Sequence, residues 1–368
     1  MRRALVAALL ACAGPAAASP SFTPIGPADL PSRAYGVSAD GQVVVGAVWP
    51  GGSITTFGDV AFRWSGGAFA PLAMGSAEGA SSDGSVVVGA VRDDNNRSHA
   101  FRWTPGDGVV QLSLPFQSTA ASIASDVSAD GGVAVGTTGP EFFPSSGGMT
   151  WTPTAPTGIG CDAAVFTAAN AVSADGSVIG GSCAGDVLPS QAVRWTLQNG
   201  AYAPLELGEL PGGFFGNSKA FGVSADGSTI VGQDDSASGL EAFVWTLPTG
   251  MLGIGDLAGG GFESSAADAS ADGSIVVGTG TTDAGSEAFV WDANAGMRSL
   301  QGVLEANGLD LAGWRLEAAT GVSDDGRRFV GWGLNPNGVE QAWLAEVPEP
   351  ATALLLALGL AGLARRRR

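Results

Sequence analysis

Residues 38–46 read SADGQVVVG, and close copies of this phrase recur at intervals of 43 to 53 residues. A long, regular period is the signature of a repeat protein in which each unit is one supersecondary element. The phrase therefore divides most of the 368-residue chain into seven similar units. The copies begin at Ser38, Ser81, Ser128, Ser173, Ser224, Ser270 and Ser323.

Each unit is predicted to contain four strands. Asp-Gly between two runs of β-forming residues indicates a tight hairpin, so the first strand precedes each Ser and the VVVG-like run is the second. A third strand contains a Trp, 21 to 26 residues after the phrase begins in the first six units, and a fourth strand follows a turn. These tryptophans are Trp64, Trp103, Trp151, Trp195, Trp245 and Trp291, with Trp343 in the seventh unit.

The second strand is apolar at consecutive rather than alternate positions, which indicates that both of its faces are covered. Sheets packed face to face in a ring meet this need and leave few exposed edges. We therefore expect an all-β fold, a seven-bladed β-propeller of four-stranded blades, with helical segments only at the two ends of the chain. A β-solenoid is the competing architecture. The seventh unit supplies only three strands, and we expect the N-terminal strand at residues 21–26 to complete that blade.

The composition excludes several classes of protein. Gly accounts for 58 residues, which argues against a mostly helical chain, while 45% hydrophobic and 14% charged residues are compatible with a buried core. The net charge is −18 with one Lys and one His, and such a surface repels nucleic acid. Because the chain has only one His, His99, it has no zinc site or catalytic nucleophile–base pair of the kinds that need two imidazoles.

The N-terminus has the features of a secretory signal peptide. A basic start precedes an apolar stretch, and residues 16–18 form an Ala-x-Ala cleavage site, so we expect residues 1–18 to be removed after Ala18. One alternative is a buried first helix. The other is a lipoprotein signal in which Cys12 is the lipidated residue.

Three elements follow one another at the C-terminus: a Pro-Glu-Pro box, the uncharged apolar segment 351–364 and a cluster of Arg. At 1.5 Å per residue the apolar segment spans about 21 Å, less than the ~30 Å hydrocarbon core of a bilayer. We therefore expect a transient inner-membrane anchor with its Arg cluster on the cytoplasmic side. The residues of the box and the cluster are Pro348, Glu349, Pro350, Arg365, Arg366, Arg367 and Arg368.

This tail resembles the PEP-CTERM sorting signal, which an exosortase recognises and from which it removes the anchor. The resemblance implies a Gram-negative bacterium and a protein delivered to the cell surface or to exopolysaccharide. On this basis the chain divides into a signal peptide at residues 1–18, a propeller body at 19–346 and a sorting tail at 347–368.

The repeats resemble those of the HAF-repeat proteins, bacterial extracellular proteins that often carry such tails. The triplet that names the family stands at residues 99–101, and variants stand at 60–62, 241–243 and 287–289. The spacer at 300–320 is also similar to the last linker of that family. The resemblance implies a fold and a destination, but no activity.

Removing both ends leaves 11 basic and 34 acidic residues, a charge of about −23, together with two cysteines. In an exported chain we expect Cys161 and Cys183 to form a disulfide, with two reactive thiols as the alternative.

The most regular polar residues are the aspartates of the repeated phrase. Their place before Gly predicts a role in the turn, with calcium ligation as an alternative, although the phrase lacks the ligand density of a calcium loop. The tryptophans are interpreted as core packing between blades rather than as a surface for carbohydrate stacking. Arg63, Arg102 and Arg194 are expected to pair with acids of their own blade. The aspartates are Asp40, Asp83, Asp130, Asp175, Asp226, Asp272 and Asp325.

The candidate binding residues are acids in the connections between second and third strands, because loops on a rigid scaffold commonly carry function. If these acids gather on one face of a ring, we expect that face to bind cations or hydroxyl-rich polysaccharide. The alternative is an acidic surface that only keeps the protein solvated. They are Asp93, Asp94, Glu141, Asp186, Asp234, Asp235 and Asp283.

We therefore expect a monomeric, noncatalytic propeller without a cofactor, which binds or scaffolds exopolysaccharide or a surface protein. The alternatives are a carbohydrate-active enzyme that uses loop carboxylates and a calcium-stabilised adhesin.

Overall fold

The computed structural model describes residues 19–52, 58–114, 120–139, 147–153, 155–162, 164–185, 189–213, 216–311 and 313–347. Within these ranges the protein is all-β apart from one short helix. The predicted signal peptide and most of the predicted sorting tail lie outside them.

Most strands belong to four-stranded antiparallel sheets, as expected. One larger sheet contains, in order, β2 (Ser32–Val37), β3 (Val43–Val48), β4 (Val60–Ser65), β5 (Ala68–Ala80), β6 (Val87–Arg92), β7 (Ser98–Thr104) and β8 (Gly108–Gln111). The next two sheets contain β9 (Ala121–Val127), β10 (Ala134–Gly139), β11 (Gly147–Trp151) and β12 (Pro156–Ile159), then β13 (Phe166–Val172), β14 (Val178–Ala184), β15 (Gln191–Gln198) and β16 (Ala201–Glu206).

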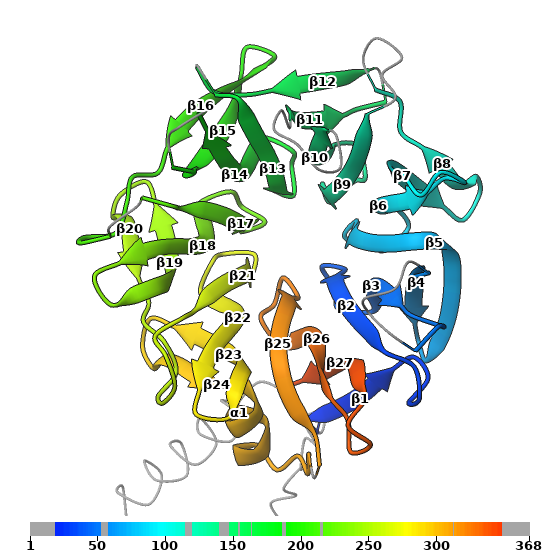
Figure 1. The fold of residues 1–368 in the computed structure, drawn as a ribbon, viewed down its shortest axis with the longest axis vertical. Coiled ribbons are helices and arrows are strands. Elements are labelled where there is room, and N and C mark those ends of the chain that lie inside the picture. Colours follow the sequence, from blue (N-terminus) through cyan, green and yellow to red (C-terminus); the bar gives the residue numbers. More distant parts are fainter. Residues whose placement is uncertain are drawn as a thin grey trace, which may run out of the picture.

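In two of the three remaining sheets the strands again follow one another in chain order, and in the last sheet the N-terminal strand is added at the outer edge. Two of them contain β17 (Lys219–Val223), β18 (Thr229–Ser236), β19 (Gly239–Thr246) and β20 (Gly250–Gly253), then β21 (Ser265–Ala269), β22 (Ile275–Thr282), β23 (Gly285–Asp292) and β24 (Gly296–Ser299). The last sheet has the order β1 (Ser21–Ile25), β27 (Glu340–Glu346), β26 (Arg328–Leu334) and β25 (Arg315–Val322). Figure 1 shows the sheets around a common axis, with the strand that precedes each repeated turn innermost, which in the last sheet is β25 and not β1.

Strand β5 is 13 residues long and serves two halves of the larger sheet. Residues 68–74 pair with β4, and residues 75–80 pair with β6. The change of partner falls at Gly75, whose φ of 129° favours glycine. A Cβ at this position would lie 2.0 Å from the carbonyl oxygen of Ala90, so the close approach of β6 also requires glycine here.

The repeated Asp-Gly turns connect the first and second strands, as predicted. They join β2 to β3, β5 to β6, β9 to β10, β13 to β14, β17 to β18, β21 to β22 and β25 to β26. All seven turn glycines have φ between 63° and 73°, the left-handed region that an Asp-Gly hairpin needs. The hairpin signal therefore predicted the correct local geometry.

The hydrophobic core is divided among the interfaces between neighbouring sheets. Every residue of β3 is buried, which confirms that a second strand is covered on both faces. Apolar side chains from adjacent sheets pack in each interface, and one cluster joins the last sheet to the first through Ile25, Ala342, Val44 and Phe62. The sheets therefore pack around a ring without a break between the last and the first.

The tryptophans of the third strands belong mainly to this core. Trp64, Trp151, Trp195, Trp245 and Trp343 are buried, while Trp103 and Trp291 are partly buried. The guanidinium of Arg63 lies over the Trp103 ring, 5.6 Å from its centroid. The predicted packing role is confirmed for the buried set, and Trp103 contributes a cation–π contact in addition.

The N-terminal strand completes the last sheet, as predicted. β1 pairs antiparallel with β27, with Ser21 opposite Glu346 and Ile25 opposite Ala342. Phe22 on β1 stacks on Trp343, with ring centroids 6.3 Å apart. Two segments from opposite ends of the chain thus share one sheet.

The expectation of helices only at the chain ends is wrong, because helix α1 (Leu300–Ala306) lies inside the body. The Ser299 hydroxyl accepts a hydrogen bond from the backbone N–H of Gly302 at 3.0 Å and caps its first turn. Leu300 and Leu304 are one helical turn apart and are both buried against the last two sheets. The longer spacer between these sheets therefore folds as a helix that covers their interface.

Deleting residues 21–26 is expected to lower the melting temperature by at least about 10 °C. The deletion removes buried Ile25 and the Phe22 ring and exposes the edge of β27. Differential scanning calorimetry checks this, with Ser21→Ala, which changes an exposed side chain, as the control. An unchanged melting temperature in the deletion variant would argue against a role of β1 in closure.

Trp245→Ala is expected to destabilise the fold by roughly 3–5 kcal/mol, because it empties a buried site between two sheets. Trp103→Ala is expected to cost less, since the Trp103 side chain is only partly buried. Urea unfolding of the two variants gives the comparison. Equal and small losses for both would show that the third-strand Trp is not a core residue.

Candidate functional site

The repeated Ser and Asp form a closed hydrogen-bond network inside each turn. The Ser hydroxyl donates to Asp Oδ1 at 2.6–3.1 Å in all seven turns. The same oxygen accepts the backbone N–H two residues after the Asp at 2.8–3.1 Å. The Ser Oγ in turn accepts the N–H that begins the second strand, as at Val43. The repeated Asp therefore serves the turn, as the Asp-Gly pattern predicts.

These hydrogen bonds stabilise the charged form of five of the turn aspartates, Asp83, Asp130, Asp175, Asp226 and Asp272. Bonds from the backbone N–H groups of Gly132 and Ser177 hold the pKa of Asp130 and of Asp175 below the usual value. Each of these carboxylates is exposed on its other side.

Backbone hydrogen bonds of 2.9–3.1 Å join six of the seven pairs of neighbouring turns around the axis. Each donor lies in one turn and each acceptor in the next, including the step from the last sheet to the first. The bonds run from Ser82 N to Ala129 O, Ala129 N to Ala174 O, Ala174 N to Ala225 O, Asp226 N to Ala271 O, Ala271 N to Asp324 O and Asp324 N to Ala39 O. The turns thus form a hydrogen-bonded collar at one end of the inner strands, called the turn collar below.

The third-strand arginines contact the turn collar rather than acids of their own sheets, so that expectation is corrected. Arg63 donates to the carbonyl oxygen of Gly84 at 3.1 Å, Arg102 to Gly131 at 3.4 Å and Arg194 to Gly227 at 3.4 Å. Each of these glycines belongs to the next turn along the chain. An arginine can reach this carbonyl because its long side chain extends across the interface between sheets.

Two adjoining cavities of about 120 and 130 Å³ lie between the inner strands, beside the turn collar. Both are lined by Asp126 and Asp268, and the second is also lined by Glu78, Tyr35 and Asn170. We call this region the channel. The sequence did not predict this site.

Asp126 and Asp268 each bind the backbone of two sheets. Oδ1 of Asp126 accepts the N–H of Val127 at 2.7 Å, and Oδ2 accepts the N–H of Val172 on the next sheet at 2.8 Å. Asp268 likewise accepts from Ala269 at 2.8 Å and from Val322 on the next sheet at 2.9 Å. The two carboxylates therefore bridge neighbouring sheets at two separate places in the ring.

Most of the other sheets have glycine at the position of these aspartates. A Cβ at Gly36 would lie 2.5 Å from the carbonyl oxygen of Glu78, and one at Gly222 would lie 2.7 Å from that of Ala267. Glycine at these positions permits neighbouring inner strands to approach closely. Where an Asp stands instead, its carboxylate bridges to the next sheet.

Burial raises the pKa of the channel acids. Glu78, Asp126 and Asp268 line the second cavity and are partly buried. Desolvation raises the pKa of Asp126 to about 7, with a smaller contribution from the negative charge of Asp268. It also raises the pKa of Asp268 to about 6 and that of Glu78 above its usual value. Hydrogen bonds from backbone N–H groups oppose the shift at both aspartates.

Three of the predicted binding-loop acids, Asp93, Asp94 and Asp283, lie in connections that follow second strands, as expected. Asp94 is exposed after β6, whereas Asp93 accepts the N–H groups of Asn95 and Arg97 and orders that loop. Asp283 accepts from Gly260 at 2.9 Å. Glu141 and Asp186 lie outside the described residues.

Asp234 is not a loop residue, and its assignment to an exposed face is wrong. It is fully buried within β18, where its carboxylate accepts the N–H groups of Leu210 and Asp235. Burial raises its pKa. Asp235 also lies in β18, opposite Leu240, because the hairpin of β18 and β19 continues to Ser236. The prediction that Asp234 and Asp235 lie in the connection after the second strand is therefore wrong, because the strand continues through both residues.

His99 and the two cysteines also occupy structural positions. His99 lies within β7 rather than in the preceding loop, and its ring Nε2 is 3.1 Å from Asp93 Oδ2. Cys161, after β12, and Cys183, on β14, form a disulfide with Cα atoms 6.3 Å apart. This bond attaches the connection after β12 to the following sheet.

Within the described ranges, no group of three or more His, Cys, Asp or Glu side chains is arranged to hold a metal ion. Those ranges also contain no helix long and apolar enough to cross a membrane. The predicted anchor at 351–364, the cleavage site at Ala18 and the predicted Arg cluster lie outside them.

Stability is expected to fall as the pH rises from 5 to 8, because of Asp126 and Asp268. Their pKa in the folded state lies above the usual 3.8, so the folded protein binds more protons than the unfolded chain between that value and about 7. The stabilisation is full at low pH and is lost as the pH rises through the folded pKa.

Asp126→Asn places a side chain that is neutral at every pH at this position. We expect it to reduce the fall in stability between pH 5 and pH 8. Melting temperatures at pH 5, 6, 7 and 8 check this, with exposed Asp107→Asn as the control. A D126N slope equal to that of the wild type would contradict the assignment.

The comparison with known families identifies the tail. Residues 346–368 match the PEP-CTERM protein-sorting motif. The match confirms the predicted sorting signal and implies an exported protein that is sorted by an exosortase. No curated protein sequence matches the chain.

Solved structures with a similar fold include propellers from other proteins. The chain is 8% identical to the β-propeller domain of the Trilobed protease from Pyrococcus furiosus, with a TM-score of 0.55 over 86% of this chain and 95% of that one. It is 12% identical to an oligogalacturonate lyase in complex with manganese, with a TM-score of 0.54 over 90% and 97%.

A puromycin-hydrolysing peptidase from Mycobacterium tuberculosis gives a TM-score of 0.57 at 16% identity over 88% of this chain. The match spans about half of that peptidase, 51% of its length. At these identities the likeness shows the fold alone. The protein is therefore an all-β, propeller-like body followed by a PEP-CTERM sorting motif.

Proposed function

We propose that the protein is a noncatalytic, seven-bladed propeller that binds or scaffolds exopolysaccharide or another surface protein after export. The observation that carries this proposal is the sorting motif at residues 346–368, directly after the last strand of a ring of sheets. In this proposal residues 1–18 are a signal peptide, and the tail anchors the chain transiently in the inner membrane of a Gram-negative bacterium. The mature monomer then reaches the cell surface or the extracellular matrix.

The count of seven blades is supported by β5. Its two halves pair with different strands, so the larger sheet divides into two four-stranded units. Each of the seven repeated phrases then supplies the turn between the first and second strands of one unit. The repeats also resemble those of HAF-repeat proteins, extracellular proteins without an established activity.

The binding surface is proposed to be the outside of the ring rather than its channel. The channel cavities of about 120 and 130 Å³ are smaller than the ~300–1,000 Å³ of typical ligand pockets, so a sugar chain does not fit there. Exposed Asp94 and Asp283 on the second-to-third-strand connections are accessible to a partner. Asp283 also accepts the backbone N–H of Gly260, but its side chain is exposed, whereas Asp93 is partly buried and Asp234 is fully buried.

A carbohydrate-active enzyme is the second candidate. Raised pKa values are typical of catalytic acids, and Glu78, Asp126 and Asp268 have them inside the channel. An oligogalacturonate lyase is among the proteins of similar fold. Against this, both oxygens of Asp126 and of Asp268 accept backbone N–H groups.

A calcium-stabilised adhesin is the third candidate. For such a protein, EDTA is expected to lower the melting temperature.

The test combines a glycan array with a hydrolysis assay on the same purified protein. We expect binding to one class of acidic or hydroxyl-rich polysaccharide without turnover, and at least a threefold loss of binding in Asp94→Asn with Asp283→Asn. Asp107→Asn is the matched control, because Asp107 is exposed at the opposite end of β7 from Asp94. Turnover would favour the enzyme, and absence of binding to both glycans and surface proteins would overturn the binding role.

A further inference from the structure

The seam of the ring, where the last sheet meets the first, contains an arginine that no other sheet has at this place. In the other sheets, the residue that begins the second strand packs under the glycine of the next turn. These contacts join Val43 to Gly84, Val86 to Gly131, Val133 to Gly176, Val178 to Gly227, Thr229 to Gly273 and Ile275 to Gly326. At the seam the equivalent pair is Arg328 and Gly41.

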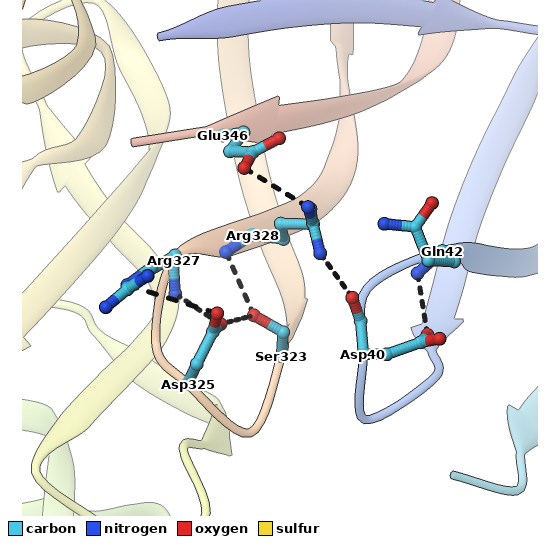
Figure 2. Close-up of polar contacts among 7 residues, drawn as sticks. All are labelled: Asp40, Gln42, Ser323, Asp325, Arg327, Arg328 and Glu346. Atoms are coloured by element: carbon cyan, nitrogen blue, oxygen red, sulfur yellow. Dashed lines mark hydrogen bonds and ion pairs between the residues drawn. The ribbon is translucent and has the colours of Figure 1, made fainter. Parts of the chain in front are cut away.

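The Arg328 side chain joins three parts of the seam. Its stem fills the space under Gly41, where a Cβ would lie 2.3 Å from the Arg328 Cδ. Its Nη1 donates to the carbonyl oxygen of Asp40 in the first turn, and its Nη2 lies 3.2 Å from Glu346 Oε1. Figure 2 shows Arg328 between Asp40 and Glu346. The guanidinium thus connects the first sheet to the last residue of β27.

The end of β27 is held by two further contacts. The backbone N–H of Val347 donates to the carbonyl oxygen of Arg327 at 2.9 Å, and the Val347 side chain packs on the core cluster of the last sheet. At its other end, Glu340 accepts from Nη2 of Arg33 on β2 at 3.0 Å. β27 is therefore tied to the first sheet near both of its ends and is paired with β26 and β1 along its length.

The sorting motif begins within this strand, at residue 346. Only Val347 separates Glu346, the last residue of β27, from the Pro-Glu-Pro box. A peptidase that binds its substrate as an extended segment needs free backbone N–H and C=O groups. Residues 342–346 of β27 are paired on both sides and residues 340–341 with β26 alone, so cleavage within β27 requires local opening of the sheet.

We propose that Arg328 and Glu346 form a latch that sets the processing boundary of the sorting tail. While the latch is engaged, the chain is protected through Val347, and the exosortase cuts only on the C-terminal side of this residue. Hydrolysis of such a bond consumes one water and leaves a carboxylate on the propeller and an amine on the released tail. The ring thereby loses its anchor and keeps all of β27. This inference rests on the proposed processing of the tail, but not on the proposed ligand.

Limited digestion with subtilisin, followed by mass spectrometry, tests the latch on the full chain purified in detergent from a host without an exosortase. In the wild type we expect the first cuts beyond Val347, with cuts at residues 340–347 at least tenfold slower. In Arg328→Met the cuts inside β27 are expected to accelerate at least tenfold. Arg327→Met is the matched control. It removes the ion pair with Asp325 of the same turn but retains the Arg327 carbonyl that accepts from Val347, so it is expected to behave as the wild type.

Glu346→Gln serves as a second variant if Arg328→Met does not fold. It removes the ion pair but keeps the Arg328 stem under Gly41 and the bond to Asp40, and we expect an acceleration of at least threefold. Cuts inside β27 of the wild type as fast as those in the tail would overturn the proposal. So would identical digestion of the wild type and both latch variants.

In a second experiment, the C-terminal residue is determined for the protein that is released from a host containing an exosortase. Products that end at Val347 or later support the boundary, and products that end earlier overturn it. Absence of any cleavage in that host would refute the proposed processing, while the subtilisin digestion would still decide whether the latch protects β27.

Discussion

The contact between successive Asp-Gly turns determines the geometry of the ring. Inside a turn, the Asp carboxylate accepts hydrogen bonds from the Ser hydroxyl and from a local backbone N–H group. Other backbone N–H groups of the turn are therefore available to bond to the next turn. The turn glycine accepts a side chain from the preceding sheet at a distance that no Cβ would permit. Each residue of the phrase therefore has a separate physical role, and together they set how one sheet is placed on the next.

The local parts of the fold could be predicted from the sequence because their signals are local. Asp-Gly between apolar runs predicted the hairpins, and the spacing of Trp245 and its equivalents predicted the third strands and their burial. The pairing of β1 with β27 followed from a count of strands, since the last repeat has only three. Helix α1 was not predicted although Ser299 is a recognisable cap, because seven residues are too few to give a clear helical periodicity.

The candidate site was less predictable, because it depends on how strands from distant repeats meet. Asp126 and Asp268 precede the repeated phrase, and nothing in their own sequence indicates that they face a channel or bridge to the next sheet. Asp234 was misplaced for a related reason: the length of a hairpin depends on pairing with the opposite strand, here Glu241, and not on the charge of its own residues. The turn collar also required the structure, since it is made of backbone groups that have no sequence signature.

The undivided strand β5 has a consequence for the way this ring comes apart. The other neighbouring sheets are joined by connections without a shared strand, whereas β5 contributes backbone hydrogen bonds to both β4 and β6. Opening either half of the larger sheet therefore disturbs the pairing of the other, and we expect its two halves to unfold as one cooperative unit. On this basis, amide protons in β3 and β6 are expected to exchange with solvent together.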